Sequence, residues 1–331
     1  MKALVYTGPK QIELRDEPDP QALEDEVLVR VEAVGICGSD MHAYFGHDER
    51  RPPPLILGHE ACGRVLDGRF QDRRVVINPL ISCGHCDDCL GGRANLCRSR
   101  QIISMPPRQG AFAELLKIPE TNILPVPDDL DPAHAALAEP IATALHAITV
   151  AERVLWRPLG EASCLVMGGG SVGLAAALVL ASRGACGVTV ADTNAGRRET
   201  VSRAGPFTVV DPTEEGAFEP NAFGLVVDAV GGRATRAAAS AAVAPGGVIV
   251  HIGLMDNDGG LDVRKFTLQE VTFIGSYTYT MVDFRATVDA IQAGVLGDLG
   301  WIERRRLEAG ATAFDDLAHG RSAAPKIVLV P

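Results

Sequence analysis

Apolar residues form short β-branched segments over about the first 125 residues of the chain, and Gly, Pro and Asp separate these segments. Short runs of this kind, bounded by turn-forming residues, are typical of strands. The pattern therefore predicts an all-β unit with strands at 2–6, 26–34, 62–66, 75–78 and 112–118.

After Asp131-Pro132 the sequence becomes rich in Ala and Leu, which predicts one connecting helix over 133–152. Beyond it, strand patterns alternate with helical patterns, as in a parallel sheet with right-handed crossovers. The predicted strands are 163–167, 187–191, 207–210, 225–230, 247–252 and 271–274, and the predicted helices are 172–183, 195–204 and 233–243. A helix at 283–294 and a strand at 326–330 follow, and this strand could return to the first sheet. The predicted fold class is α/β, a β-rich unit joined to a doubly wound parallel sheet.

Length and charge restrict the number of domains and the function classes that fit this chain. A chain of 331 residues is longer than one hydrophobic core usually serves, which favours two domains. A formal net charge of −11 without a dense Lys/Arg run argues against a nucleic-acid partner. The longest apolar stretch, 172–181, is too short for a membrane helix of about 20 residues, and no export signal is visible. We expect a cytoplasmic protein without a membrane partner, whose eight cysteines are metal ligands or thiols.

A glycine-rich loop follows the predicted strand 163–167 and precedes a predicted helix. In this context the glycines allow a tight turn and the close approach of a pyrophosphate, which binds at the helix N-terminus. The expected cofactor-binding residues of the loop are Gly168, Gly170, Ser171, Val172 and Gly173. A glycine turn that binds no nucleotide is the alternative, and it is disfavoured by the strand and helix around it.

Asp192 stands at the end of the next predicted strand, where a carboxylate accepts hydrogen bonds from the adenosine ribose. Because it would repel a 2′-phosphate, NAD is favoured over NADP. Arg197 and Arg198 follow closely and weaken this preference without reversing it. Arg197 is included among the expected cofactor-binding residues.

Four cysteines occur as Cys-x2-Cys-x2-Cys-x7-Cys at Cys83, Cys86, Cys89 and Cys97. Four thiolates can close a tetrahedral shell around zinc, which leaves no position for a substrate, so a structural zinc is predicted. An iron–sulfur cluster is the competing interpretation, but the bacterial spacing has a shorter last interval and a Pro after the last Cys, where this chain has Arg98.

A second set of metal-type residues is spread over three segments and consists of Cys37, His59, Glu60 and Glu139. On spacing alone, buried packing residues remain the more frequent explanation of such a lone Cys or His. The residues by themselves leave both interpretations open.

Taken together, the segments Gly35 to His42, Gly58-His59-Glu60 and Ala138-Glu139-Pro140 resemble those of the zinc-containing medium-chain alcohol dehydrogenases, especially the sorbitol and threonine dehydrogenase branch. The four-cysteine lobe and the glycine loop also occur where this family has them. The resemblance implies a GroES-like catalytic domain of residues 1–147 and 288–331, with a structural zinc lobe at about 80–100. It implies a Rossmann nucleotide domain at 148–287.

The resemblance also implies a catalytic zinc held by Cys37, His59 and Glu60, with Glu139 at the place of a cysteine ligand in liver-type relatives. Three protein ligands leave one position for water or alcohol. Because two carboxylates and a thiolate would close the shell, we expect one carboxylate to bind and one to lie just outside. Asp40 resembles the family's acid that orients the zinc histidine. Two zinc ions per chain are therefore expected.

The family's mechanism implies that zinc lowers the pKa of the substrate hydroxyl and that hydride passes to the nicotinamide. Ser39 would pass the proton through the nicotinamide ribose to His42. The expected substrate is a secondary alcohol of the polyol, diol or sugar-derived type. Ala43 replaces a Tyr of sorbitol dehydrogenases and Gly275-Ser276-Tyr277 stands where they carry Phe-Arg-Tyr, so a true sorbitol dehydrogenase is disfavoured.

Two further interpretations remain. An amino-alcohol or sugar-phosphate dehydrogenase would use the same machinery, and Arg50, Arg51 and Arg108 could form a phosphate pocket. A nicotinamide-binding structural or sensing protein is the non-enzyme alternative, against which the intact zinc-type residues argue. The family also implies a homodimer or homotetramer formed through the sheet edge at 271–279.

Overall fold

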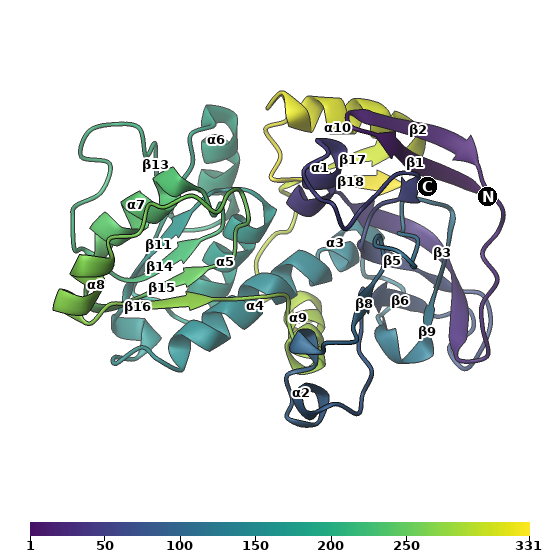
Figure 1. Ribbon diagram of the computed structural model, residues 1–331, viewed down its shortest axis with the longest axis horizontal. Helices are drawn as coiled ribbons and strands as arrows, with labels where there is room; N and C mark the ends of the chain where they lie inside the picture. Colours follow the sequence, from purple (N-terminus) through teal and green to yellow (C-terminus); the bar gives the residue numbers. More distant parts are fainter.

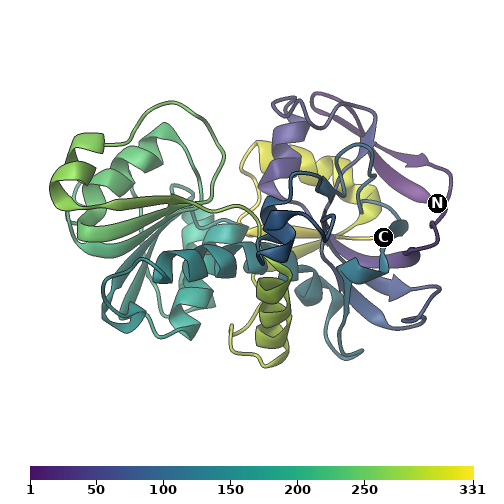
Figure 2. The same cartoon turned by 60° about the horizontal axis from the view of Figure 1, so that its bottom comes forward.

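Two lobes flank a central helix, α4 (Ala138–Glu152), in the computed structural model, which describes residues 1–331 (Figure 1). Figure 2 shows the same division from a second direction, with the N-terminal strands and the C-terminal segment in one lobe. The parallel sheet lies in the other lobe. The two-part organisation predicted from hydrophobic patterning is thus observed.

The first lobe contains a seven-stranded sheet with the order β10-β6-β5-β3-β18-β17, in which β9 also pairs with β3. A smaller sheet has the order β2-β1-β4. The strands of this lobe are β1 (Lys2–Gly8), β2 (Gln11–Asp16), β3 (Glu26–Gly35), β4 (Leu55–Ile56), β5 (Glu60–Val65), β6 (Arg74–Ile77), β7 (Leu80–Ile81), β8 (Gln101–Ile102), β9 (Leu115–Pro119), β10 (Ile123–Pro125), β17 (Ile302–Arg306) and β18 (Lys326–Val330).

The C-terminal strand completes the first sheet, as expected. Val328 pairs with Gly35 of β3 in antiparallel register, and β17 pairs with β18 in parallel. The strand predicted at 112–118 starts later, at Leu115, because the chain before it turns to form a single bridge between Ala113 and Ala3.

The second lobe is a six-stranded sheet with the order β13-β12-β11-β14-β15-β16, and all its strand pairs are parallel. This is the doubly wound order in which dinucleotides bind at the carboxyl ends of the central strands. The strands are β11 (Ser163–Met167), β12 (Gly187–Ala191), β13 (Thr208–Val210), β14 (Phe223–Asp228), β15 (Val243–His251) and β16 (Thr272–Gly275). β15 begins four residues before its predicted start. Its first residues include Pro245 and Gly246, which are typical of loops, so the sequence pattern placed the start of the strand after them.

Helices connect and cover these sheets. They are α1 (Gly38–Tyr44), α2 (Asp87–Leu90), α3 (Pro132–Ala136), α5 (Ser171–Ser182), α6 (Ala195–Ala204), α7 (Arg233–Ala242), α8 (Val263–Gln269), α9 (Met281–Gln292) and α10 (Gly310–Ala318), besides α4. The helix predicted over 133–152 is interrupted at Leu137 and forms α3 and α4. Asp131 caps α3 by accepting a hydrogen bond from the Ala133 amide, which is the predicted helix start.

Helix α4 fixes the relation of the lobes. Its buried Ala, Ile and Leu side chains belong to one apolar cluster that extends from Cys62 and Val76 of the first lobe to Val250 of the parallel sheet. Val288 and Ile291 of α9 belong to the same cluster, so a domain limit after residue 287 falls inside a continuous helix. The exact domain limits stay a prediction. None of the helices is both long and apolar enough to cross a membrane.

Candidate active site and metal centres

The short helix α1 was not predicted, and it positions the first group of site residues. Cys37 is its N-cap, and the Asp40 carboxylate accepts hydrogen bonds from the amides of Cys37 (2.9 Å) and Gly58 (3.3 Å). Asp40 is fully buried, and its Oδ1 lies 3.4 Å from Nδ1 of His59. Burial acts to raise the pKa of Asp40, but His59, Arg51 and the Cys37 amide outweigh it and hold that pKa below its usual range. The ionised Asp40 therefore lies against the imidazole of His59, and its role in orienting that ring stays a prediction.

The structure brings Cys37, His59 and Glu60 together, with one potential ligand atom from each lying within 4.8 Å of the others. The sheet accounts for this, because β3 ends where β5 begins and Gly35 pairs with Glu60. A Cβ atom at Gly35 would lie 2.1 Å from Oε2 of Glu60, so only glycine leaves room for the carboxylate. A partly exposed thiol together with a buried imidazole and a buried carboxylate forms a donor set that suits zinc.

Glu60 and Lys326 form a fully buried ion pair that the sequence did not reveal. The Lys326 ammonium donates to both carboxylate oxygens of Glu60, at 2.7 and 2.6 Å, and to the Ile36 carbonyl at 2.8 Å. Lys326 is the first residue of β18, and an isolated lysine at the start of an apolar strand was the only available sign. Burial acts to lower the pKa of Lys326, but the charges of Glu60 and Cys37 raise it above its usual value.

Glu139 lies near this group without belonging to it. It is buried in the first turn of α4 and accepts a hydrogen bond from the Tyr279 hydroxyl at 3.1 Å. Burial raises the pKa of Glu139 to about 7; the charge of Glu60 acts in the same direction, while His59 and Lys326 oppose it. Tyr279 was not predicted as a site residue. The arrangement is compatible with one carboxylate inside a metal shell and one outside, and the choice stays a prediction.

Ser39 and His42 lie on α1 three residues apart, which is the spacing of neighbours on one helix face. The Ser39 hydroxyl is 3.4 Å from Nε2 of His59. It therefore lies beside the group of Cys37, His59 and Glu60, which is called the metal-type group below. Burial lowers the pKa of the half-buried His42, with a smaller contribution from the charge of His47. The lowered pKa favours neutral His42, which can accept a proton, and its place in the proton route stays a prediction.

The three loop arginines do not form a phosphate pocket. Arg51 is buried and donates to the carbonyls of Ser39 and Ser104 and to the Asp48 carboxylate. Arg50 pairs with the same Asp48, and Arg108 pairs with Glu26. Each guanidinium is already paired with a carboxylate of the protein. These arginines therefore no longer favour a sugar phosphate as the substrate. Ser104 itself was missed, and its hydroxyl lies 3.4 Å from Nδ1 of His59.

The four predicted lobe cysteines are also gathered together. Sγ of Cys89 lies 3.9 Å from Sγ of Cys83 and 3.5 Å from Sγ of Cys86. A zinc–sulfur bond of about 2.3 Å in a tetrahedron gives sulfur–sulfur edges of about 3.8 Å, so the spacing fits a zinc ion. Hydrogen bonds from the amides of His85 and Cys86 lower the pKa of Cys83 to about 6, which favours the thiolate. His85 is exposed and its Nδ1 lies 2.8 Å from the Cys83 carbonyl oxygen.

The glycine loop has the geometry of a nucleotide-binding turn. Gly168 has a φ of +94°, and a Cβ at Gly173 would lie 1.7 Å from the Gly168 carbonyl oxygen. Gly170 caps the 12-residue helix α5, in which Ser171 and Val172 are the first residues. The buried hydroxyl of Ser171 has no hydrogen-bond partner in the protein, as expected of a group that a phosphate completes.

Asp192 follows β12 and faces the same loop. Its Oδ2 accepts a hydrogen bond from the Gly169 amide at 2.8 Å and lies 3.5 Å from the Arg197 guanidinium. The Nε of Arg197 is buried without a partner. These groups fit a bound ribose, with a carboxylate for hydroxyl groups and an unpaired donor beside it.

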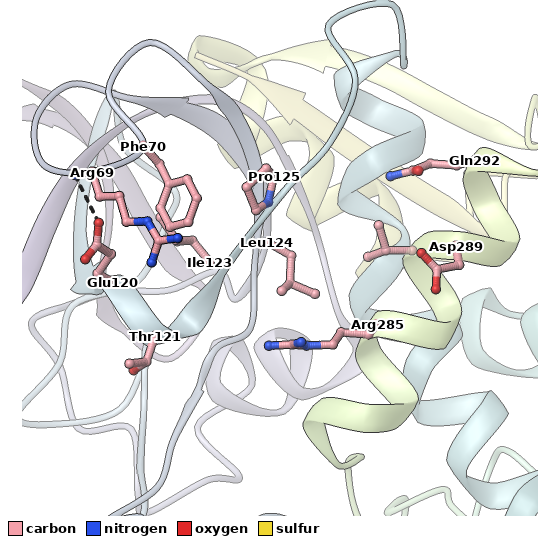
Figure 3. Close-up of a pocket in the computed structure, with 11 residues that line it drawn as sticks. Arg69, Phe70, Glu120, Thr121, Ile123, Leu124, Pro125, Arg285, Asp289 and Gln292 are labelled. Carbon is pink, nitrogen blue, oxygen red and sulfur yellow. Dashed lines mark hydrogen bonds between the residues drawn. The ribbon is translucent and has the colours of Figure 1, made fainter.

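A separate cavity of about 560 Å³ lies between β10 and α9 (Figure 3). Arg69 and Glu120 line its first-lobe side, while Arg285 and Asp289 of α9 line the other. None of its 11 lining residues belongs to the predicted metal or nucleotide sites. The chemistry is therefore assigned to the group around Cys37 and not to this cavity.

Two known protein families match the chain. Residues 23–128 match the alcohol dehydrogenase GroES-like domain, and residues 171–293 match the zinc-binding dehydrogenase domain. L-galactonate-5-dehydrogenase of Escherichia coli K12 is 33% identical over 297 residues, which cover 86% of this chain and 85% of that protein. Sorbitol dehydrogenase of Bacillus subtilis 168 is 33% identical over 296 residues, with 84% and 82% covered.

Solved structures agree with this likeness. A Sinorhizobium meliloti protein described as a zinc-binding dehydrogenase, with NADP bound, has a TM-score of 0.90 and 28% sequence identity. The match covers 100% of this chain and 99% of that one. Both lobes and their arrangement are thus shared with that protein.

Proposed function

Since the chain belongs to the zinc-containing medium-chain alcohol dehydrogenase family, we propose that it oxidises a secondary alcohol of the polyol, diol or sugar-derived type to a ketone, with NAD as the hydride acceptor. The observation that carries this proposal is the close group of Cys37, His59 and Glu60, whose potential ligand atoms lie within 4.8 Å of one another. The names of the two relatives, which act on an aldonate and on sorbitol, support the substrate class.

We assign two zinc ions to each chain. Cys37, His59 and one of the carboxylates Glu60 and Glu139 would hold the catalytic ion, and the four lobe cysteines would hold the structural ion. A catalytic zinc acts as a Lewis acid and lowers the pKa of a bound hydroxyl. Lys326 neutralises the negative charge of Glu60 when that carboxylate lies outside the shell.

The chain's own residues supply the proton route. Ser39 would take the proton of the reacting hydroxyl while giving up its own, and His42 would release a proton to solvent at the other end of the relay. Asp40 keeps the imidazole of His59 in one orientation throughout. Tyr279 holds Glu139 by its hydrogen bond and so limits the movement of that carboxylate.

Asp192 supports the proposed preference for NAD. Its carboxylate is already bonded to the Gly169 amide and cannot turn away from a ribose at this loop without losing that bond. An additional 2′-phosphate would lie near this negative charge and be repelled. The NADP in the Sinorhizobium relative belongs to that protein, so direct measurement has to establish the preference in this chain.

A homodimer or homotetramer is the proposed assembly, formed through the edge strand β16. Four apolar side chains around this edge are 61–70% exposed, namely Leu254, Met255, Val263 and Leu268. Covering such a patch with a second copy would remove it from water. The eight free thiols support the proposed cytoplasmic location, where thiols stay reduced.

The test is absorbance of reduced nicotinamide with zinc-loaded protein, NAD or NADP, and a panel of polyols, aldonates, threonine, sugar phosphates and simple secondary alcohols. The proposal expects NAD reduction with polyols or sugar-derived alcohols and little with threonine. If NAD is reduced only with threonine or only with a sugar phosphate, the substrate belongs to that class and not to the polyols. Absence of reduction with two bound zinc ions and measurable NADH binding would favour the non-catalytic interpretation.

A further inference from the structure

Arg51 is a buried arginine whose side chain joins two segments that flank His59. It lies between α1 and β4 and is 3% exposed. Its Nη1 donates to the Ser39 carbonyl at 3.2 Å, and its Nε donates to the Ser104 carbonyl at 3.0 Å. The Asp48 carboxylate lies 2.6 Å from Nη1 and neutralises the guanidinium. One side chain therefore fixes α1 relative to the loop that follows β8.

The two serines that Arg51 holds present their hydroxyl groups to the two nitrogens of one imidazole. Oγ of Ser39 lies 3.4 Å from Nε2 of His59, and Oγ of Ser104 lies 3.4 Å from Nδ1. Oδ1 of Asp40 is also 3.4 Å from Nδ1. An imidazole that binds a metal through Nε2 carries its proton on Nδ1, and the acceptors of that proton set the direction of the ring. Ser104 is therefore placed to share this task with Asp40.

The backbone of Ser104 has a conformation that serine does not prefer. Ser104 is fully buried and has a φ of +66°, in the left-handed region that favours glycine. Such a backbone persists at other residues only where the surroundings enforce it, and the bond from Arg51 to the Ser104 carbonyl is one such contact. A glycine would relieve the strain but would lose the hydroxyl that faces His59. The hydroxyl therefore gives a reason for a serine at this position.

We propose that Arg51 is a positioning residue of the active site, which acts through the carbonyls of Ser39 and Ser104. Through Ser39 it holds the hydroxyl that begins the proton route beside the zinc histidine. Through Ser104 it holds the second acceptor of the His59 ring. A guanidinium suits this task because its planar fork of donors bonds separate acceptors, which the compact ammonium of lysine does not reproduce. The inference rests on the proposed function and adds to it a residue that links proton transfer to metal binding.

The first experiment measures zinc release from the full chain to a chromophoric chelator. The release phase that Cys37→Ser abolishes belongs to the metal-type group, which separates it from the four-cysteine lobe. Ser104→Ala and Arg51→Lys should each lower the zinc affinity of this group about tenfold, the smaller effect usual for a group behind a metal ligand. Ser104→Gly should lose as much affinity, although its melting temperature should equal or exceed that of Ser104→Ala because glycine accepts the left-handed backbone.

The second experiment measures kcat and KM of zinc-saturated protein with the alcohol that the substrate panel identifies. Arg51→Lys should lower kcat at least about tenfold and leave KM within about threefold, because it displaces Ser39 and no group that binds the substrate. Adding Arg51→Lys to Ser39→Ala should not lower kcat further, and adding it to Ser104→Ala should not weaken zinc binding further. Losses that do not add are expected when one residue acts through another, whereas general destabilisation would add to them.

Arg50→Lys is the matched control, because Arg50 pairs with the same Asp48 but is 59% exposed and bonds neither serine. Its zinc affinity and kcat should stay within about twofold of the wild type, since exposed ion pairs contribute little. If Arg51→Lys does not fold, Arg51→Gln takes its place with the same expected losses, because Arg50 remains as the partner of Asp48.

Fully additive losses in the double variants would overturn the proposal, and so would wild-type zinc affinity in both Ser104→Ala and Arg51→Lys. If the wild type oxidises no alcohol, the proposed function fails. Zinc release, which requires no substrate, then decides the inference from the single variants and from Arg51→Lys combined with Ser104→Ala.

Discussion

The Lys326 ammonium lies 2.7 and 2.6 Å from the two carboxylate oxygens of Glu60, and neither side chain is more than 2% exposed. A buried ion pair of this kind is weak support for stability, because desolvation of both charges offsets their attraction. Its position suggests another role. Glu60 belongs to the metal-type group with Cys37 and His59, so Lys326 and a zinc ion would compete for the same carboxylate.

Lys326→Met should therefore make stability depend on zinc. In metal-free protein the variant leaves Glu60 buried without a counter-charge, and the free energy of unfolding should fall by about 3–5 kcal/mol. Zinc supplies the missing positive charge, so the loss should shrink in zinc-loaded protein. Urea unfolding with and without chelator measures both values. Lys2→Met, an exposed lysine on β1, is the control, and an equal loss in both states would show that zinc does not approach Glu60.

The same pair shows where sequence-based prediction ends. The bounds of β11 and β12 were predicted correctly because the strand pattern and its turns are local in the chain. Lys326 and Glu60 are 266 residues apart, and no periodicity relates them.

The remaining site residues also fall into those that a local motif predicts and those that only the folded chain brings together. Asp40 and His59 were predicted through short motifs that resemble a known family, and their contact is observed. Tyr279 and Glu139, 140 residues apart, were not linked, because only the packing of the two lobes brings them together. Helix α1 was missed because seven residues starting with glycine carry little helical signal.

Ser39→Ala should reduce kcat by about 10²–10⁴-fold, which is the usual contribution of a group that transfers a proton. Zinc content and NADH affinity should stay at wild-type values, since Ser39 is not among the potential zinc ligands and its one hydrogen bond, to His59, is long at 3.4 Å. Steady-state rates, metal analysis and NADH fluorescence check the three quantities. Ser202→Ala on the exposed face of α6 is the control. Unchanged turnover in Ser39→Ala would remove Ser39 from the proton route.

Cys89→Ser should lower the zinc content from two ions per chain to one. Sγ of Cys89 lies within 3.9 Å of two other thiol sulfurs, so its loss opens the tetrahedral shell. Metal analysis after dialysis against a weak chelator measures the content. Cys186→Ser removes an exposed thiol outside both groups and should keep two ions. Two ions in Cys89→Ser would contradict a four-cysteine site.

Asp192→Ala should shift the cofactor preference towards NADP. The variant removes the negative charge beside the ribose. It also removes the carboxylate that lies 3.5 Å from the Arg197 guanidinium, which leaves this guanidinium available to a 2′-phosphate. The ratio of kcat/KM for NADP to that for NAD should rise roughly 100-fold, equal to about 2.7 kcal/mol. Glu199→Gln, an exposed carboxylate on α6, is the control. A wild-type enzyme that already prefers NADP would refute the role of Asp192.

Asp283→Asn should reveal a stabilisation that disappears in acid. Burial acts to raise the pKa of Asp283, but hydrogen bonds from His146 and Thr280 outweigh it and lower that pKa to about 2. Because the folded pKa lies below the unfolded value of about 3.9, the carboxylate stabilises the fold above pH 4, by about 2 kcal/mol. This contribution is lost as the pH falls from 4 towards 2, and about half of it is gone at pH 3.

Urea unfolding at pH 7, 4 and 3 measures the effect as the difference between wild type and Asp283→Asn. Taking this difference cancels the other carboxylates, which titrate in both proteins. Asp289→Asn, an exposed position on the same helix, should differ little from wild type at any pH. A gap between wild type and Asp283→Asn that is the same at pH 7 and pH 3 would mean that the His146 contact stabilises the packing of α4 against α9 without any help from the charge of Asp283.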